Sequence, residues 1–117
     1  MPPPSYPALF QVNTRVRLAE LAATLGRRAT LDDMPDAELD RLAADGFDLV
    51  WFLGVWQTGE AARLVSRSKP EWLDEYRRVL PDFREEDVCG SCFAVRDYRV
   101  HQDFGGDQAL ARLRVRL

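Results

Sequence analysis

The chain has 117 residues, of which 46% are apolar and 30% charged, as expected for at most one globular domain. Its 16 basic and 19 acidic residues leave a net charge of −3, which argues against a nucleic-acid partner because such partners require a strongly basic surface. No apolar run reaches the ~18 residues of a membrane span. No signal peptide is apparent before Cys89 and Cys92, so we expect a reducing, cytoplasmic setting.

The chain opens with a strand followed by a helix. Residues 1–7 form a proline-rich leader, which is expected to be stiff and extended. A first strand is predicted over residues 8–14. A helix is then predicted over Val16–Leu25, because its apolar side chains recur at helical spacing, and Gly26 ends it.

A second helix leads into the most apolar stretch of the chain. Pro35 suits the first turn of this helix, and Asp33 is a candidate N-cap. Gly46 marks its end, where a left-handed residue is favoured. Residues 47–53 then contain only one charge and do not alternate, which predicts a strand of a parallel sheet with both faces covered. Trp51, in the middle of this strand, is expected in the core.

The remainder of the chain is a long segment, residues 54–104, and a final helix. The long segment contains two predicted helices, Glu60–Arg67 and Glu71–Leu80, and an extended stretch, Phe93–Val100. The final helix covers residues 107–117 and follows two glycines. The order strand, helix, strand, insertion, helix predicts a parallel α/β fold. An insertion of roughly fifty residues is unusual for a connecting loop, and α/β barrels build their sites on such loops.

Few residues suggest chemistry by their type and spacing. Cys89 and Cys92 form a C-x-x-C, which is consistent with a redox dithiol, half of a zinc site or incidental thiols. The stretch after Cys92 is extended, whereas a redox C-x-x-C requires a helix start, and only His101 could add a further zinc ligand. Incidental thiols are favoured, and no metal or cofactor is expected. His101 is interpreted as a packing residue rather than a general base.

Two aromatic residues and one acid lie near the presumed rim of the sheet. Trp56 and Phe93 could stack on the C–H face of a sugar ring or could pack in the core, and both interpretations stay open. Asp97 is flanked by Arg96 and Arg99, which favours an ion-pair anchor over a catalyst. Gly105 and the glycine after it could bind an anion at a helix start, but a tight turn is the favoured interpretation.

Three segments resemble successive pieces of the α-amylase family of glycoside hydrolases. They are residues 8–15 (ALFQVNTR), 39–56 (LDRLAADGFDLVWFLGVW) and 90–106 (GSCFAVRDYRVHQDFGG). In order they resemble the first barrel strand, the first helix with the second strand, and the second βα loop. Residues 107–117 are similar to the helix before the third strand. The resemblance implies the first two βα units of a TIM-barrel-like fold, with a long helical insertion in the second βα loop.

The resemblance implies roles for the aromatic and acidic residues of the rim. Phe93 would be the platform under the sugar ring whose bond is cut, although tyrosine is usual at that place. Asp97 would shape the loop, and Trp56 is a further candidate sugar contact. Cys92 stands where relatives tend to have proline. The implied ligand is an α-glucan or α-glucoside.

The family's catalytic carboxylates have no counterpart in this chain. Retaining glycosidases need two carboxyl groups about 5–5.5 Å apart, and the family places them on later strands. We therefore expect an N-terminal fragment that is not catalytic alone, and we assign no catalytic role to Glu60, Glu71 or Asp97. The alternative is a non-enzymatic α/β module that binds a sugar or a protein. Exposed strand edges also predict possible self-association.

Overall fold

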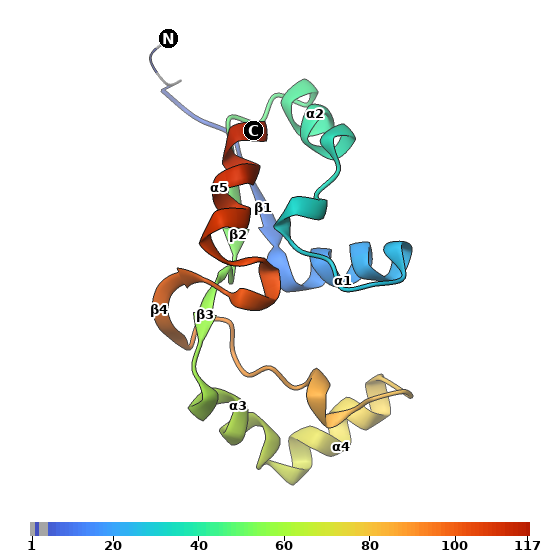
Figure 1. Cartoon of the computed structure of the whole chain (residues 1–117). Helices are drawn as coiled ribbons and strands as arrows, with labels where there is room; N and C mark the ends of the chain where they lie inside the picture. Colours follow the sequence, from blue (N-terminus) through green and yellow to red (C-terminus); the bar gives the residue numbers. More distant parts are fainter. Residues whose placement is uncertain (1, 3–4) are drawn as a thin grey trace. The chain divides into compact units, whose positions relative to one another are not determined.

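The chain divides into two compact units in the computed structural model, which describes residue 2 and residues 5–117. The first, here called the sheet unit, comprises Met1–Val55 and Arg99–Leu117; the second, the insertion unit, comprises Trp56–Tyr98. Both are drawn in Figure 1. Residues 1, 3 and 4 of the predicted leader lie outside the described residues. No helix in the described part of the chain is long and apolar enough to cross a membrane.

The sheet unit is built on a pair of parallel strands. Its elements are β1 (Leu9–Asn13), α1 (Thr14–Leu25), η1 (Leu31–Asp33), α2 (Asp36–Ala44), β2 (Leu49–Leu53), η3 (Gln102–Phe104) and α5 (Gly106–Arg116). Leu9 lies opposite Leu49, and Asn13 lies opposite Leu53. The predicted strands, their parallel direction and the α/β class are therefore confirmed, with bounds shifted by one or two residues.

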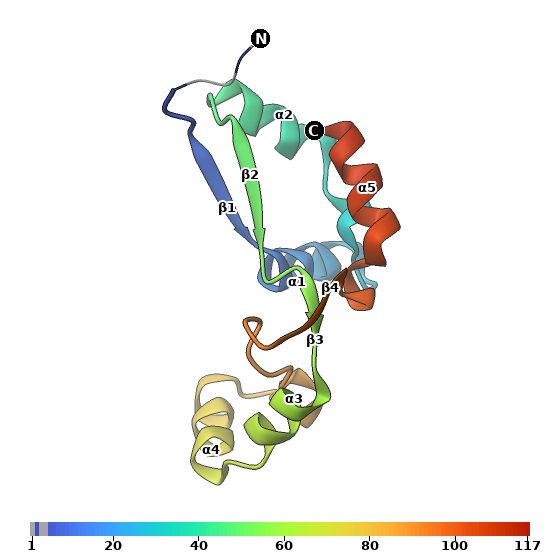
Figure 2. The same cartoon turned by 90° about the vertical axis from the view of Figure 1, so that its left-hand side faces the viewer.

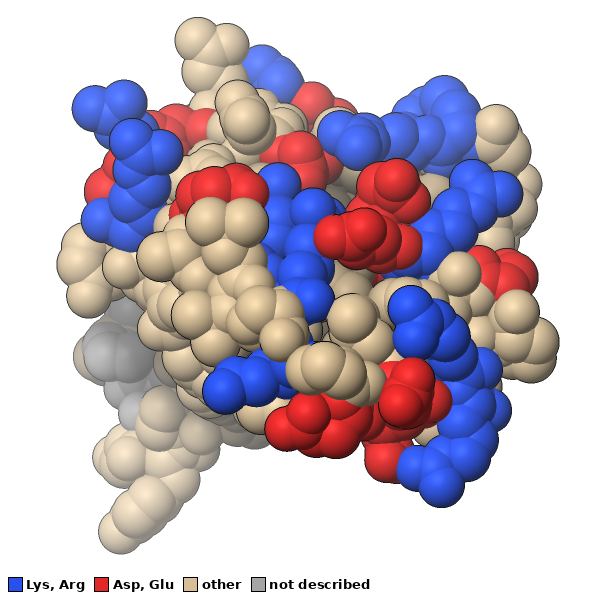
Figure 3. All heavy atoms as spheres, turned by 90° about the horizontal axis from the view of Figure 1, so that it is seen from below, with Lys and Arg blue, Asp and Glu red and all other residues tan. Residues whose placement is uncertain are grey.

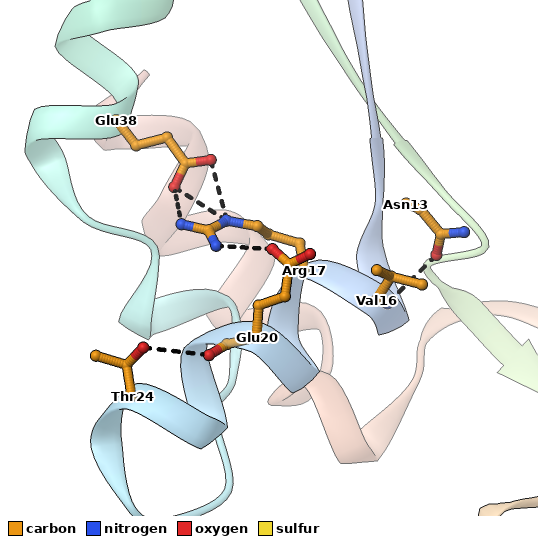
Figure 4. A network of polar contacts seen from close by, with 6 residues as sticks. All are labelled: Asn13, Val16, Arg17, Glu20, Thr24 and Glu38. Carbon is orange, nitrogen blue, oxygen red and sulfur yellow. Dashed lines mark hydrogen bonds and ion pairs between the residues drawn. The ribbon is translucent and has the colours of Figure 1, made fainter. Parts of the chain in front are cut away.

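The helices of the sheet unit begin and end largely where the sequence predicts. The Asn13 side chain accepts the Val16 N–H at 3.4 Å and caps α1, as Figure 4 shows. Gly26 and Gly46 follow α1 and α2 with left-handed backbones. The prediction that Asp33 caps α2 is wrong. Asp33 accepts the Thr30 N–H at 2.8 Å and closes a capping box around η1, while Pro35 precedes α2.

The core of the sheet unit lies on one side of the strand pair. Val12 and Phe52 point into it, and α2 and α5 lie on that side in Figure 2. The helices add buried side chains, among them Leu18, Leu21, Leu39, Leu42, Ala109 and Leu113. The expectation that both faces are covered is wrong, and Trp51 is not a core residue. Leu9, Leu49 and Trp51 are 49%, 52% and 48% exposed.

Ion pairs join the helices of the sheet unit to one another. Arg17 of α1 donates to Glu38 of α2 at 2.6 Å, a contact drawn in Figure 4. Arg112 of α5 donates two hydrogen bonds of 2.8 Å to Asp32 of η1. Bidentate pairs of this kind fix orientation as well as adding energy. They hold α5 against η1 although the bonded residues are 80 positions apart in sequence.

The largest resolved carboxylate shift also belongs to this framework. The Arg27 guanidinium and the backbone N–H of Thr30 lower the pKa of Asp33 to about 2. The hydrogen bonds from Arg112 likewise lower the pKa of Asp32. Both groups stabilise η1, so these shifts reflect structural ion pairs rather than a reactive centre.

The insertion unit contains two helices and a second strand pair. Its elements are β3 (Trp56–Thr58), α3 (Glu60–Arg67), α4 (Pro70–Val79), η2 (Glu85–Asp87) and most of β4 (Val95–Val100). The two predicted helices are confirmed. β3 was not predicted, because a strand of only three residues shows no measurable period. Val88 is the one buried apolar side chain among residues 56–98, all of which the structure describes.

Candidate functional site

The three predicted sugar contacts all lie in the insertion unit. Trp56 begins β3, and Asp97 lies in β4, the strand that pairs with β3. Phe93 lies in the turn that leads into β4. The structure therefore places Trp56 and Asp97 on neighbouring strands and Phe93 just ahead of them in the chain.

Phe93 stands on a turn whose backbone is held by hydrogen bonds. The Ala94 N–H donates to the Ser91 carbonyl at 3.1 Å, and the Phe93 N–H donates to the Ser91 hydroxyl at 3.2 Å. The Gly59 N–H then donates to the Ala94 carbonyl at 3.3 Å. The Phe93 side chain remains 74% exposed. Of the two interpretations left open by the sequence, core packing is therefore wrong for Phe93.

The loop before this turn is fastened to α3. Gly90 has a φ of +79°, and a Cβ added there would lie 2.9 Å from the Arg63 nitrogen. Only glycine fits such a close approach without a shift of the backbone. The Arg67 side chain also donates to the Val88 carbonyl at 3.3 Å. Two contacts, at Gly90 and at Val88, thus anchor the residues before Phe93 to α3.

Trp56 has an aromatic neighbour that sequence reasoning missed. Its ring meets the Tyr98 ring edge to face, with centroids 5.6 Å apart and planes at 82°. Trp56 is half-buried, whereas Tyr98 is 79% exposed. The alternation of residues 93–100 indicates which side chains of this strand lie on the same face, because side chains two positions apart on a strand share a face. Asp97 is half-buried, and by the same alternation it faces away from Tyr98.

Several carboxylates of the insertion unit form exposed ion pairs with arginines of the same helix. Glu60 pairs with Arg63 at 3.4 Å, and Asp74 pairs with Arg77 at 3.2 Å. Among the described residues, no three His, Cys, Asp or Glu side chains gather so that they could hold a metal ion. Cys89 and Cys92 are free thiols. The unit therefore offers aromatic surface, and no acid in it stands out as a catalyst.

His101 and Gly105 have structural roles in the sheet unit. His101 is buried, and its Nδ1 accepts the Asp103 N–H at 3.1 Å, which caps η3. A Cβ on Gly105 would lie 2.5 Å from the Ala109 Cβ, and its φ is +103°. These observations agree with the packing histidine and the tight turn favoured by the sequence.

A pocket in the insertion unit was not predicted. It has a volume of about 490 Å³. Its lining is mainly apolar and includes Tyr76, Val79, Leu80, Phe83 and Val88. Tyr76 and Val79 lie in α4 and Leu80 is its C-cap, whereas Phe83 lies beyond Pro81, so no single helix face indicated the pocket. The Tyr76 and Phe83 rings lie 5.8 Å apart.

Basic and acidic side chains are interspersed on the surface drawn in Figure 3. Local pairs such as Arg78 with Glu75, at 2.5 Å, account for part of this mixing. A phosphate backbone would need a continuous basic stripe instead. The absence of a nucleic-acid partner stays a prediction from net charge.

Comparisons with protein-family models, curated proteins and solved structures find no match to this chain. The resemblance to the α-amylase family therefore remains a prediction from the residues that carry it. Any function has to be inferred from the geometry of the described residues.

Proposed function

We propose that this chain is the N-terminal portion of an α-amylase-family glycosidase that contacts α-glucosides through the insertion unit. The observation that carries the proposal is the Phe93 ring, which is 74% exposed on a turn held by two backbone–backbone hydrogen bonds and one bond to the Ser91 hydroxyl. Because the hydrogen-bonded turn leaves this apolar ring exposed to solvent, the ring is accessible to a ligand. The family resemblance names a sugar as that ligand.

The order of elements supports the same proposal. β1, α1 and α2 precede β2, which is parallel to β1, and the insertion follows the C-terminal end of β2. In α/β barrels the loops at this end of the strands form the site. A chain that opens a (β/α)8 barrel would place Phe93 in its second βα loop.

The chemistry offered by the loop is stacking rather than catalysis. A sugar presents C–H groups to an aromatic face, and phenylalanine provides that face without the hydrogen bond of a tyrosine hydroxyl. Trp56 and Tyr98 supply a second aromatic surface, and Asp97, beside Tyr98 on β4, would shape the loop. A retaining mechanism needs two carboxyl groups about 5–5.5 Å apart, and no pair of acids can be assigned to it. The chain contributes binding and leaves bond cleavage to residues outside it.

The binding part of the proposal is tested by titrating the isotope-labelled chain with maltose and following its amide resonances. Shifts are expected at residues 91–98, and Phe93→Ala should weaken the affinity about tenfold, equivalent to about 1.4 kcal/mol. Leu64→Ala is the matched control, because Leu64 is an apolar residue of the same unit that is 59% exposed. Equal affinities of both variants and the unchanged chain would rule out a Phe93 platform.

The catalytic part is tested with a nitrophenyl α-glucoside. The purified chain is expected to release no nitrophenol above the uncatalysed rate. Turnover that a single Asp or Glu substitution abolishes would contradict the proposal, because it would locate a catalytic acid within these residues.

The second candidate, a non-enzymatic binding module, is favoured by the apolar pocket. A volume of about 490 Å³ lies within the range of small-ligand sites. Its lining by Tyr76, Leu80 and Phe83 would suit an apolar group. Maltose-dependent shifts confined to these residues, with none near Phe93, would favour this candidate over the barrel portion.

A further inference from the structure

We propose that the apolar pocket of the insertion unit binds a small organic ammonium ion, with the charged group at Asp87 and the apolar body between Tyr76 and Phe83. This pocket, here called the α4 pocket, has a volume of about 490 Å³, and its lining comes only from residues 66–91. The inference goes beyond the apolar ligand of the second candidate function because it specifies a charge. It does not depend on sugar binding at Phe93.

The walls of the α4 pocket suit the apolar body of such a ligand. The Tyr76 and Phe83 rings lie 5.8 Å apart, with their planes at 39°. Leu80 and Val88 add aliphatic surface, and Val88 is buried. Binding is favoured here because a ring or hydrocarbon chain placed against these side chains leaves water.

The one charged side chain in the lining of the α4 pocket is negative. Asp87 is the last residue of η2, and its Oδ2 accepts the Arg84 N–H at 2.8 Å. No lysine or arginine of the described residues forms an ion pair with Asp87, and none of them lines the pocket. The Oδ1 atom is therefore available to a ligand donor. A cation is attracted to this site and an anion is repelled.

The aromatic rings favour a cation over a neutral ligand of the same shape, because the face of a ring is electrostatically negative. Phe83 shows this within the chain, since the Arg77 guanidinium carbon lies 5.9 Å from its ring centroid. Arg77 pairs with Asp74 at 3.2 Å, and Arg67 donates to the Val88 carbonyl. Both arginines lie outside the lining, so they leave the interior of the pocket without a positive charge.

Other classes of ligand fit these walls less well. A carboxylate or phosphate would meet Asp87 and find no basic side chain in the lining. A neutral apolar molecule would displace water from the Asp87 carboxylate without replacing its hydrogen bonds, and this costs free energy. Asp87 is exposed whereas Val88 is buried, so an ammonium group can stay in contact with water while its apolar body is enclosed.

The charge preference is tested with three ligands that share one apolar body. Phenylbutylamine, which is protonated at neutral pH, is compared with phenylbutanol and phenylbutyrate. Each is titrated into the isotope-labelled full chain, and the amide resonances are followed. The ammonium ion is expected to bind about tenfold more tightly than the alcohol, and the carboxylate more weakly than the alcohol. The shifts should map to residues that line the α4 pocket.

The role of Asp87 is tested with Asp87→Asn. This variant should lower the preference for the ammonium ion over the alcohol to about threefold, the part that the rings supply. Asparagine can still accept the Arg84 N–H, so η2 is retained. The matched control is Glu86→Gln, which removes the same charge from the neighbouring residue of η2, outside the lining. It should keep the tenfold preference of the unchanged chain.

Four results would overturn the proposal. They are no binding of phenylbutylamine at millimolar concentration, equal affinities of the unchanged chain for the amine and the alcohol, tighter binding of the carboxylate, and an undiminished preference in Asp87→Asn. None of them bears on the maltose titration, which reports on Phe93.

Discussion

Asp33 shows how a single side chain can hold two segments together. It accepts the Thr30 N–H at 2.8 Å and pairs with Arg27 at 2.7 Å. One carboxylate therefore accepts from a part-buried backbone N–H and from a guanidinium. The sequence indicates that Asp33 is a capping residue but does not identify its helix. The choice between η1 and α2 depends on how the backbone turns between Thr30 and Pro35.

At the residue scale, we predict that Asp33→Asn makes stability less dependent on acid. The folded pKa of Asp33 is lowered to about 2, below the ~3.9 of an unfolded aspartate, so its stabilisation is present above pH ~4. It is lost as the pH falls from about 4 to 2. The substitution removes the ion pair with Arg27 and should cost up to about 1 kcal/mol of unfolding free energy near neutral pH.

The measurement is urea denaturation of both proteins at several pH values between 2 and 7. The two unfolding free energies should converge toward pH 2, because protonated Asp33 no longer pairs with Arg27. A difference that stays constant over this range would show that the ion pair does not set the pKa of Asp33.

At the scale of elements, α5 is the helix on which the sheet unit most depends. It joins the unit from the far end of the sequence and packs on η1 through Ala109 and Leu113, both of which are fully buried. Arg112 adds paired hydrogen bonds to Asp32. Without α5, the residues of η1 and the covered face of the sheet would lose their apolar neighbours.

We predict that Leu113→Ala destabilises the chain by about 2–5 kcal/mol, because it leaves a cavity where the side chain is fully buried. Val115→Ala, two residues along the same helix, is the control. Val115 is 87% exposed, so its substitution should change the unfolding free energy by less than about 0.5 kcal/mol. Chemical denaturation of the two variants measures both effects. Equal losses would mean that α5 does not dock as the structure has it.

At the scale of the whole molecule, the two units differ in how much apolar surface they bury. The sheet unit has a core that draws on β1, β2, α1, α2 and α5. In the insertion unit, whose residues are all described, only Val88 is a buried apolar side chain. Side chains such as Leu64, Val79 and Phe93 are instead more than half exposed. Local stability follows buried apolar contact, so the units should open independently.

We therefore predict that amide hydrogens of α3 and α4 exchange with solvent faster than those of β1, β2 and α5. Native-state hydrogen exchange followed by mass spectrometry measures this directly. The hydrogen-bonded Ala94 amide and its neighbours are expected between the two groups. Slower exchange in α4 than in β2 would show that the insertion unit has a core of its own.

The candidate site could be anticipated only in part. The family resemblance indicates Phe93 and Asp97, the place near the presumed rim indicates Trp56, and the structure places all three in one unit. Tyr98 was missed although it shares an edge-to-face contact with Trp56, because a short exposed strand gives a weak pattern. The pocket around Tyr76 and Phe83 was missed because its far wall, Val88 to Ser91, comes from a separate segment.

The amino-acid sequence by itself determined where the helices and both parallel strands lie. Apolar periodicity, prolines and glycines act over a few residues, and these signals place α1, α3, α5, β1 and β2 to within about two residues. Only the tertiary structure decided which surfaces are covered. Trp51 and Phe52 are adjacent and equally apolar, yet one is half exposed and the other buried. Burial depends on whether a distant helix such as α5 packs over a face, and local sequence does not encode that contact.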